Sequence, residues 1–209
     1  PCGKFANEPL KYYNSSKEHI TLSVTSSLKN MKIDHIDMLL IHRPDPFMNA
    51  DETGKVLDEL IKKGVVRAVG VSNFKPWDWN LLQSRMENPL LTNQIEFSLE
   101  NHQPLTNGDL SFHYEKKIPV MAWSPLGGGR LMKKKTELFS TLEKTAKHFE
   151  TDVATIAIAW ILAHPSKILP IVGTNNLERI KKIHMAINTK IDRVSWFKLY
   201  SRAIGHEVA

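Results

Sequence analysis

An alternation of short apolar runs with helical segments is the feature that most constrains how this chain can fold. Five apolar runs read as strands, and they cover residues 36–42, 65–71, 91–97, 118–123 and 168–172. Segments with helical periodicity separate them, mostly at intervals of ~25–30 residues, which predicts βαβ units and a parallel sheet. Right-handed crossovers would bring the carboxyl ends of all five strands to one rim. We therefore expect a single α/β domain over residues 1–209, with its chemistry on that rim.

Capping and stop signals give the expected bounds of the helices. The run from Ser15 to Glu18 has the form of a capping box, so the first helix is expected to begin at Ser15. Asp51 is expected to begin the second helix, and Lys63-Gly64 supplies its stop signal. Further helices are expected near residues 76–86, 109–117, 137–149, 153–163, 177–187 and 193–203.

Composition narrows the compartment and the class of partner. A single cysteine, Cys2, excludes an internal disulfide framework and favours a reducing, cytoplasmic setting. No apolar run approaches the ~18 residues that a membrane span needs. The net charge of +6 comes from scattered basic residues, which favours a solvated surface over a site for a phosphate-bearing small molecule. Neither nucleic acid nor a membrane is expected as a partner.

Polar residues at the ends of the first three strands each have a structural and a functional interpretation. His42 either satisfies a loop hydrogen bond or takes part in chemistry at the mouth of the sheet. Ser72 and Asn73 are either ordinary turn residues or ligands for a flat amide such as nicotinamide. Gln94 is either a satisfied core side chain or a second ligand for that amide.

The fourth strand is followed by a candidate phosphate-binding stretch. Trp123, at its end, either stacks on a planar ring or belongs to the core. Ser124 then begins a stretch with three consecutive glycines at residues 127–129. Glycines permit close approach of the backbone to a phosphate or pyrophosphate, and a flexible loop is the alternative.

The fifth strand leads to a second candidate anion site. Gly173 and Thr174 precede a helix, and Arg179 lies one turn into it, where its guanidinium either pairs with a phosphate or stays solvated. No metal site is predicted, since His35 and His42 lack partner ligands and the chain has no Cys/His cluster with zinc spacing.

Taken together, these segments resemble the aldo-keto reductase superfamily. The matching motifs are the strand ending in His42-Arg-Pro, then Gly70-Val-Ser-Asn-Phe74, Thr92-Asn-Gln94, Ala122-Trp-Ser-Pro-Leu126 and Pro170-Ile-Val-Gly-Thr174. The chain is most similar to a bacterial oxidoreductase subgroup with His-Arg-Pro-Asp-Pro and Trp-Ser-x-Leu-Gly-Gly-Gly-Arg motifs. The resemblance implies a TIM-type (β/α)8 barrel of the α/β class that reduces a carbonyl to an alcohol with NADPH, without a metal.

The resemblance also implies a role for each candidate residue. His42 would orient and polarise the substrate carbonyl, and Trp123 would stack on the nicotinamide. The nicotinamide carboxamide would be held by Ser72, Asn73 and Gln94. The other cofactor residues are Ser124, Pro125, Leu126, Gly127 and Gly128 along the pyrophosphate path, and Gly173, Thr174 and Arg179 toward the adenosine phosphate.

The chain departs from the family pattern near its start. The family's lysine would precede Cys2, where Pro1 stands, and Lys4 would point to the other face of a strand. Tyr12 and Tyr13 are expected in a loop and are not counterparts of the family's proton-donating tyrosine. We therefore expect an incomplete barrel that holds strands four to eight and lacks strands one to three, with their Tyr, Asp and Lys positions.

Three interpretations of an incomplete barrel stay open. The chain is a fragment or mispredicted product of a reductase, a non-catalytic nucleotide-binding remnant or regulatory subunit, or a protein completed by another chain. Without a general acid, we expect NADPH binding without carbonyl-dependent oxidation of NADPH. The sequence assigns neither the physiological carbonyl, nor the preference for NADP over NAD, nor the oligomeric state.

Overall fold

The computed structural model describes residues 2–3, 10–133 and 136–208 and divides the chain into two compact units. The first unit spans residues 1–94 and the second spans residues 95–209. The boundary falls inside one strand, β5 (Leu90–Glu96). Each unit is described by itself below, and the assignment of residues 1–209 to a single domain stays a prediction.

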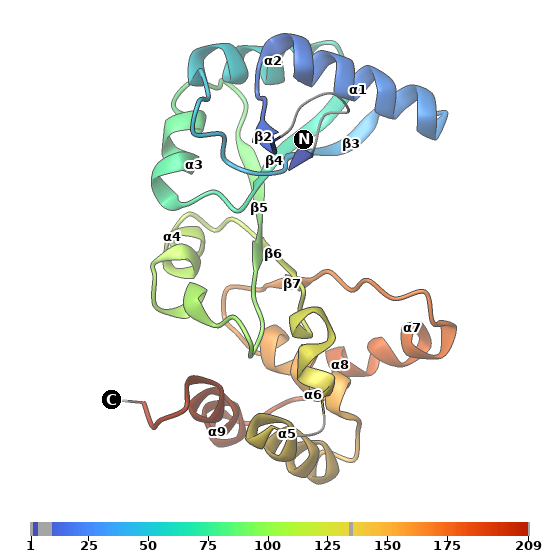
Figure 1. Cartoon of the computed structure of the whole chain (residues 1–209), viewed down its shortest axis with the longest axis vertical. Helices are drawn as coiled ribbons and strands as arrows, with labels where there is room; N and C mark the ends of the chain where they lie inside the picture. The colour runs from blue at the N-terminus through green and yellow to red at the C-terminus, as the bar shows by residue number, and fades with distance from the viewer. Residues whose placement is uncertain (1, 4–9, 134–135, 209) are drawn as a thin grey trace. The chain divides into compact units, whose positions relative to one another are not determined.

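The first unit contains parallel strands covered by helices (Figure 1). Its elements are β1 (Cys2–Gly3), β2 (Tyr12–Tyr13), α1 (Lys17–Met31), β3 (Ile36–Ile41), α2 (Ala50–Lys62), β4 (Val66–Ser72), α3 (Pro76–Gln83) and the start of β5. Strand β4 pairs in parallel with β3 on one side and β5 on the other. In this register Ser72 lies opposite Gln94, so the ends of two strands bring predicted site residues together.

The N-caps of the first two helices differ from the residues that the capping signals predicted. The N-cap of α1 is Ser16, whose side chain accepts a hydrogen bond from the His19 amide. Ser15 instead donates from its backbone and its hydroxyl to Asp45, so the predicted capping box is wrong. Asn49 caps α2 ahead of the predicted Asp51. The helices themselves are confirmed.

The second unit continues the alternation of strands and helices. Its elements are η1 (Gln103–Leu105), α4 (Asp109–Glu115), β6 (Val120–Trp123), η2 (Gly127–Met132), α5 (Glu137–His148), α6 (Val153–Leu162), β7 (Leu169–Pro170), α7 (Leu177–Ile183), α8 (Met185–Asn188) and α9 (Arg193–Ile204). Strands β6 and β7 pair in parallel. The five predicted strands are confirmed, and the pairs β3–β4, β4–β5 and β6–β7 are parallel as predicted.

The last strand and the helix after it are shorter than predicted. The expected strand at 168–172 is reduced to two residues. The hydrogen bond from the Ile171 amide to the Ala122 oxygen follows directly after this short strand. The expected helix at 177–187 is broken at His184 into α7 and α8. No residue of α7 is buried. This stretch therefore lacks the packing that would hold longer regular elements.

The core of the second unit centres on α6, most of whose residues are buried. Trp160 is fully buried and stacks on Trp196 of α9, with ring centroids 4.8 Å apart and planes 11° from parallel. Each indole N–H donates to the backbone oxygen of the other tryptophan, at 3.2 and 3.0 Å. These two bonds satisfy both polar tips, so the C-terminal helix is fixed to the core by its aromatic residues.

Candidate active site

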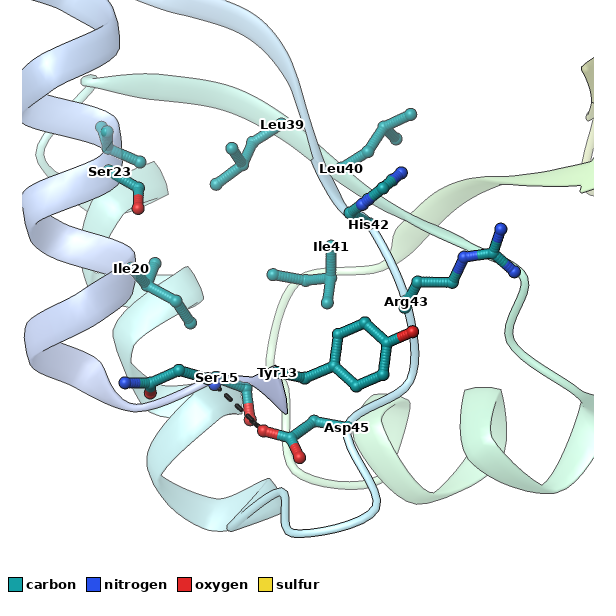
Figure 2. A pocket seen from close by; sticks show the side chains of 12 residues that line it. Tyr13, Ser15, Ile20, Ser23, Leu39, Leu40, Ile41, His42, Arg43 and Asp45 are labelled. Carbon is teal, nitrogen blue, oxygen red and sulfur yellow. Dashed lines mark hydrogen bonds between the residues drawn. The ribbon is translucent and has the colours of Figure 1, made fainter. Parts of the chain in front are cut away.

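His42 follows the last residue of β3 and lines a pocket of about 170 Å³ in the first unit. Figure 2 shows its imidazole on the same stretch of chain as Arg43, beside the apolar side chains of β3. Desolvation, and next the positive charge of Arg43, lower the pKa of His42 from its ordinary value of 6.5. The neutral ring is therefore favoured at neutral pH, and a neutral imidazole can donate a hydrogen bond to a carbonyl.

The same pocket is lined by polar residues that were not predicted to belong to the site. Tyr13 is one of them. Tyr12 and Tyr13 together form strand β2, so their predicted loop position is wrong. Asp45 is another: its carboxylate accepts from the Ser15 amide at 3.1 Å and hydroxyl at 2.9 Å, and from the Phe47 amide at 2.9 Å. Three bonds on one carboxylate fix the loop that follows His42. The available signal was the position of Asp45 in the His-Arg-Pro-Asp-Pro motif.

Ser72, Asn73 and Gln94 are joined by hydrogen bonds at the ends of β4 and β5. The Ser72 hydroxyl donates to the Gln94 backbone oxygen at 2.9 Å and accepts from the Asn73 amide nitrogen at 2.7 Å. The Asn73 backbone N–H donates to the same Gln94 oxygen at 2.9 Å. We call these three residues the Ser72 corner.

The Ser72 corner has a defined geometry. Asn73 adopts a left-handed φ of 60°, which turns the chain sharply where β4 ends and which asparagine tolerates better than most residues. Because Ser72 and Gln94 are register partners in a parallel pair, their side chains share one face of the sheet. Ser72 is buried, whereas Asn73 and Gln94 are half-buried. Hydroxyl and carboxamide groups in such an array suit the donors and acceptors of a flat amide.

In the second unit, a tight turn rich in glycine follows Trp123 at the end of β6. Trp123 is half-buried, and its backbone oxygen accepts from the Phe97 amide at 3.4 Å. Ser124 has a φ of 50°, and its oxygen accepts from the Gly127 amide at 2.8 Å. We call residues 127–129, whose φ values are 59°, 62° and 87°, the glycine turn.

The glycine turn is anchored where it begins and exposed where it ends. Pro125 and Gly127 are buried and Leu126 is half-buried, which anchors the turn, while Gly128 is exposed. A Cβ on Gly129 would meet nothing within 4 Å, so the backbone there is open to approach. The Gly127 and Gly129 amides donate within the turn, to the backbone oxygens of Ser124 and Leu126 at 2.8 and 2.9 Å, so these two N–H groups are already hydrogen-bonded.

The segment after β7 is exposed, and the hydrogen bonds described for it join nearby residues. Gly173 and Arg179 are exposed and Thr174 is half-buried. The Thr174 hydroxyl accepts from the Asn176 amide at 3.2 Å, and the Asn176 side chain accepts from the Arg179 amide at 3.0 Å as the N-cap of α7. This segment offers hydroxyl and guanidinium donors without a buried framework.

The structure thus brings together some predicted site residues within each unit. It joins the Ser72 corner in the first unit, and it gathers Trp123, Ser124 and the glycine turn in the second. One rim shared by all of them stays a prediction. Pro1 and Lys4 lie outside the described residues. Within residues 2–3, 10–133 and 136–208, no three His, Cys, Asp or Glu side chains gather as a metal site would need. None of the described helices is long and apolar enough to cross a membrane.

Comparisons with known proteins give consistent matches. The sequence profile of the aldo/keto reductase family matches residues 4–200. The chain is 51% identical to a 6-dehydroglucose reductase of Agrobacterium fabrum, over 100% of the chain and 71% of that protein. It is 40% identical to the oxidoreductase YdhF of Escherichia coli, over 94% of the chain and 67% of that protein.

Solved structures match as well. The crystal structure of the thermostable aldo-keto reductase Tm1743 with the inhibitor epalrestat has a TM-score of 0.83 and 27% identity, covering 90% of this chain and 67% of that one. An aldo/keto reductase of Klebsiella pneumoniae with NADP and acetate has a TM-score of 0.80 at 24% identity, covering 93% of this chain and 68% of that one. None of these matches supports the expectation of missing barrel strands, which stays a prediction.

Proposed function

Since the chain belongs to the aldo/keto reductase family and has its TIM-barrel type of α/β fold, we propose that it reduces a small-molecule carbonyl to an alcohol with NADPH. The observation that carries the proposal is the 51% identity, over the full chain, to a 6-dehydroglucose reductase. A second relative with that name, from Novosphingobium aromaticivorans, is 32% identical over 94% of the chain. We therefore propose an oxidised glucose such as 6-dehydroglucose as the substrate.

In this proposal the Ser72 corner holds the carboxamide of the nicotinamide. A carboxamide carries an oxygen acceptor and an N–H donor, and Ser72, Asn73 and Gln94 supply side chains of both kinds. The hydrogen bonds among these residues support the role, because they fix the corner before any ligand arrives. A ligand site with fixed groups loses less entropy on binding.

The second unit supplies the remaining cofactor contacts of the proposal. Trp123 is proposed to stack on the nicotinamide ring, which its half-buried position supports. The pyrophosphate is assigned to the residues from Ser124, Pro125 and Leu126 through Gly127 and Gly128. The adenosine phosphate is assigned to Gly173, Thr174 and Arg179. When bound, the cofactor supplies the hydride, and these residues hold and orient it.

His42 is the proposed catalytic residue. Its lowered pKa keeps the ring neutral, so it can orient and polarise a carbonyl by donating one hydrogen bond. A neutral imidazole is a poor source of the proton that the product alcohol needs. The expectation that these 209 residues alone bind NADPH without oxidising it therefore stays a prediction, as does a cytoplasmic location.

Two separate measurements test the proposal. Fluorescence titration measures NADPH binding, and loss of NADPH absorbance measures turnover with 6-dehydroglucose, with glucose as the matched control lacking the extra carbonyl. NADPH oxidation that depends on 6-dehydroglucose and is lost in His42→Phe would support the whole proposal. Binding without turnover would support the cofactor site alone and would overturn carbonyl reduction by these 209 residues. Failure of the chain to bind NADPH would overturn the proposal.

A further inference from the structure

Arg130 follows the glycine turn directly and faces two carboxylates of the second unit. Its Nε lies 3.4 Å from Oε2 of Glu100, and its Nη2 lies 3.9 Å from Oε1 of Glu96. Glu96 ends β5, and Glu100 lies in the loop that follows. We call Arg130 with these two glutamates the Arg130 strap.

The Arg130 strap lies against the glycine turn. A Cβ on Gly127 would come within 2.6 Å of Cγ of Glu100, so the Glu100 side chain is packed on that glycine. A Cβ on Gly128 would lie 3.7 Å from Nη1 of Arg130, which places the guanidinium beside the next glycine. The absence of a side chain at Gly127 is therefore what lets Glu100 pack on the turn, whereas a Cβ on Gly128 would make only an ordinary contact with Arg130.

The contacts within the strap are weak enough to be exchanged. Both N–O distances exceed those of a well-formed charge-assisted hydrogen bond, and the Arg130 side chain is 53% exposed. An exposed ion pair of this kind contributes little to stability. Two carboxylates around one guanidinium also leave one negative charge in excess beside the turn. This excess negative charge repels an anion beside the glycine turn. The repulsion is offset when the Arg130 guanidinium turns from the carboxylates to the anion.

We propose that Arg130 is a ligand for the diphosphate of a dinucleotide and changes partners when the dinucleotide binds. This inference rests on the proposed NADP(H) function and adds a residue to it. Glu96 and Glu100 are positioning residues that hold the guanidinium beside the turn while no phosphate is there. The guanidinium then leaves the two carboxylates and binds phosphate oxygens, for which its planar, forked donors are suited.

The sign of the effect of Glu100→Gln tests the exchange. Arg130→Met should weaken NADPH binding by about 10- to 100-fold, as expected for loss of a charged hydrogen bond, and Arg130→Lys should recover part of this. Glu100→Gln should tighten NADPH binding by about two- to fivefold, because it removes a competing charge. If the strap only stiffened the turn, Glu100→Gln would weaken binding together with Arg130→Met. Unchanged or weaker binding in Glu100→Gln would therefore overturn the proposal.

Two controls separate this inference from the proposed function. Arg202 forms an exposed ion pair with Glu137 elsewhere in the second unit, so Arg202→Met should leave NADPH affinity unchanged. Inorganic pyrophosphate should compete with NADPH, and its inhibition constant should be lower for the unsubstituted protein than for Arg130→Met. If the unsubstituted protein does not bind NADPH, the proposed function itself fails. If it binds NADPH and Arg130→Met binds equally well, only the role of Arg130 fails.

Discussion

The Ser72 corner and the segment after β7 both follow a strand, yet they are held in different ways. At the corner, three residues share three hydrogen bonds and one of the residues is buried. After β7, Gly173 and Arg179 are exposed, and the bonds join residues only two or three positions apart. The corner is therefore held by hydrogen bonds between two strands, whereas the later segment is more exposed and its hydrogen bonds are local.

This difference indicates how the two ends of a dinucleotide would be recognised. A fixed array of neutral donors and acceptors discriminates by geometry, because a group that does not fit leaves polar atoms unpaired. An exposed segment with a guanidinium attracts by charge, and the attraction falls as salt screens it. Variants in the first region should therefore change stability, and variants in the second should change affinity for phosphate.

The largest expected effect is on stability at the Ser72 corner. Ser72→Ala removes the acceptor of the Asn73 side chain and the donor to Gln94, and it should lower the free energy of unfolding by about 1–3 kcal/mol. Thr174→Ala, in the exposed segment, should change it by less than about 0.5 kcal/mol. Urea unfolding measures both. Equal losses in the two variants would show that the corner is no better formed than the later segment.

The second effect compares the stability of alanine variants at two glycines, one where a side chain would clash and one where it would not. Gly127→Ala would place a Cβ against Glu100 at a φ of 59°, and it should destabilise the protein by about 1–2 kcal/mol. Gly173→Ala meets nothing within 4 Å, and its φ lies outside the range in which a side chain is strained, so it should be neutral or slightly stabilising. Thermal unfolding of the two variants makes the comparison. A destabilised Gly173→Ala would mean that the later segment is more tightly constrained than its exposure indicates.

The third effect tests charge recognition at the exposed segment. Arg179→Gln should weaken NADPH binding by about tenfold and leave NADH binding nearly unchanged, since only NADPH carries the extra phosphate. Raising the salt concentration should reduce the difference between the two cofactors in the unsubstituted protein. Fluorescence titrations with each cofactor measure the ratio. The same loss for NADH would assign Arg179 to another part of the cofactor.

Most of the fold followed from the sequence because it depends on local periodicity. The strands and helices were predicted from apolar spacing, and the polar residues at strand ends from their position after each run. What could not be predicted depends on contacts between distant residues. Ser15 does not cap the helix because its hydroxyl donates to Asp45, thirty positions away, and the local sequence does not predict that bond.

The candidate site shows the same limit. The Ser72 corner was predictable as a set of residues, but its internal bonds require the β4–β5 register. The Arg130 strap was not predicted, although Arg130 ends a quoted motif, because both glutamates come from a segment thirty or more positions earlier. The break at His184 reflects missing burial in α7, which periodicity alone does not reveal.

The smallest expected effect is a pH dependence that compares buried and exposed histidines. Burial lowers the pKa of His113, which is fully buried in α4 with Nδ1–H donating to the Asp109 backbone oxygen at 2.7 Å. Desolvation also lowers the pKa of the exposed His42. A folded-state pKa below the unfolded value of about 6.5 means that the unfolded chain binds protons first as the pH falls. Stability is therefore fully present above about pH 6.5 and is lost as the pH falls through the folded pKa.

Urea unfolding at about pH 7.5 and about pH 5.5 should show this loss in the unsubstituted protein. His113→Gln should be less stable at the higher pH and should lose less on acidification, because it removes a group that only the unfolded chain protonates readily. His42→Gln should change the pH dependence less, since an exposed imidazole is stabilised by solvent in both states. A larger change in His42→Gln than in His113→Gln would mean that His42 is more desolvated than its exposure indicates.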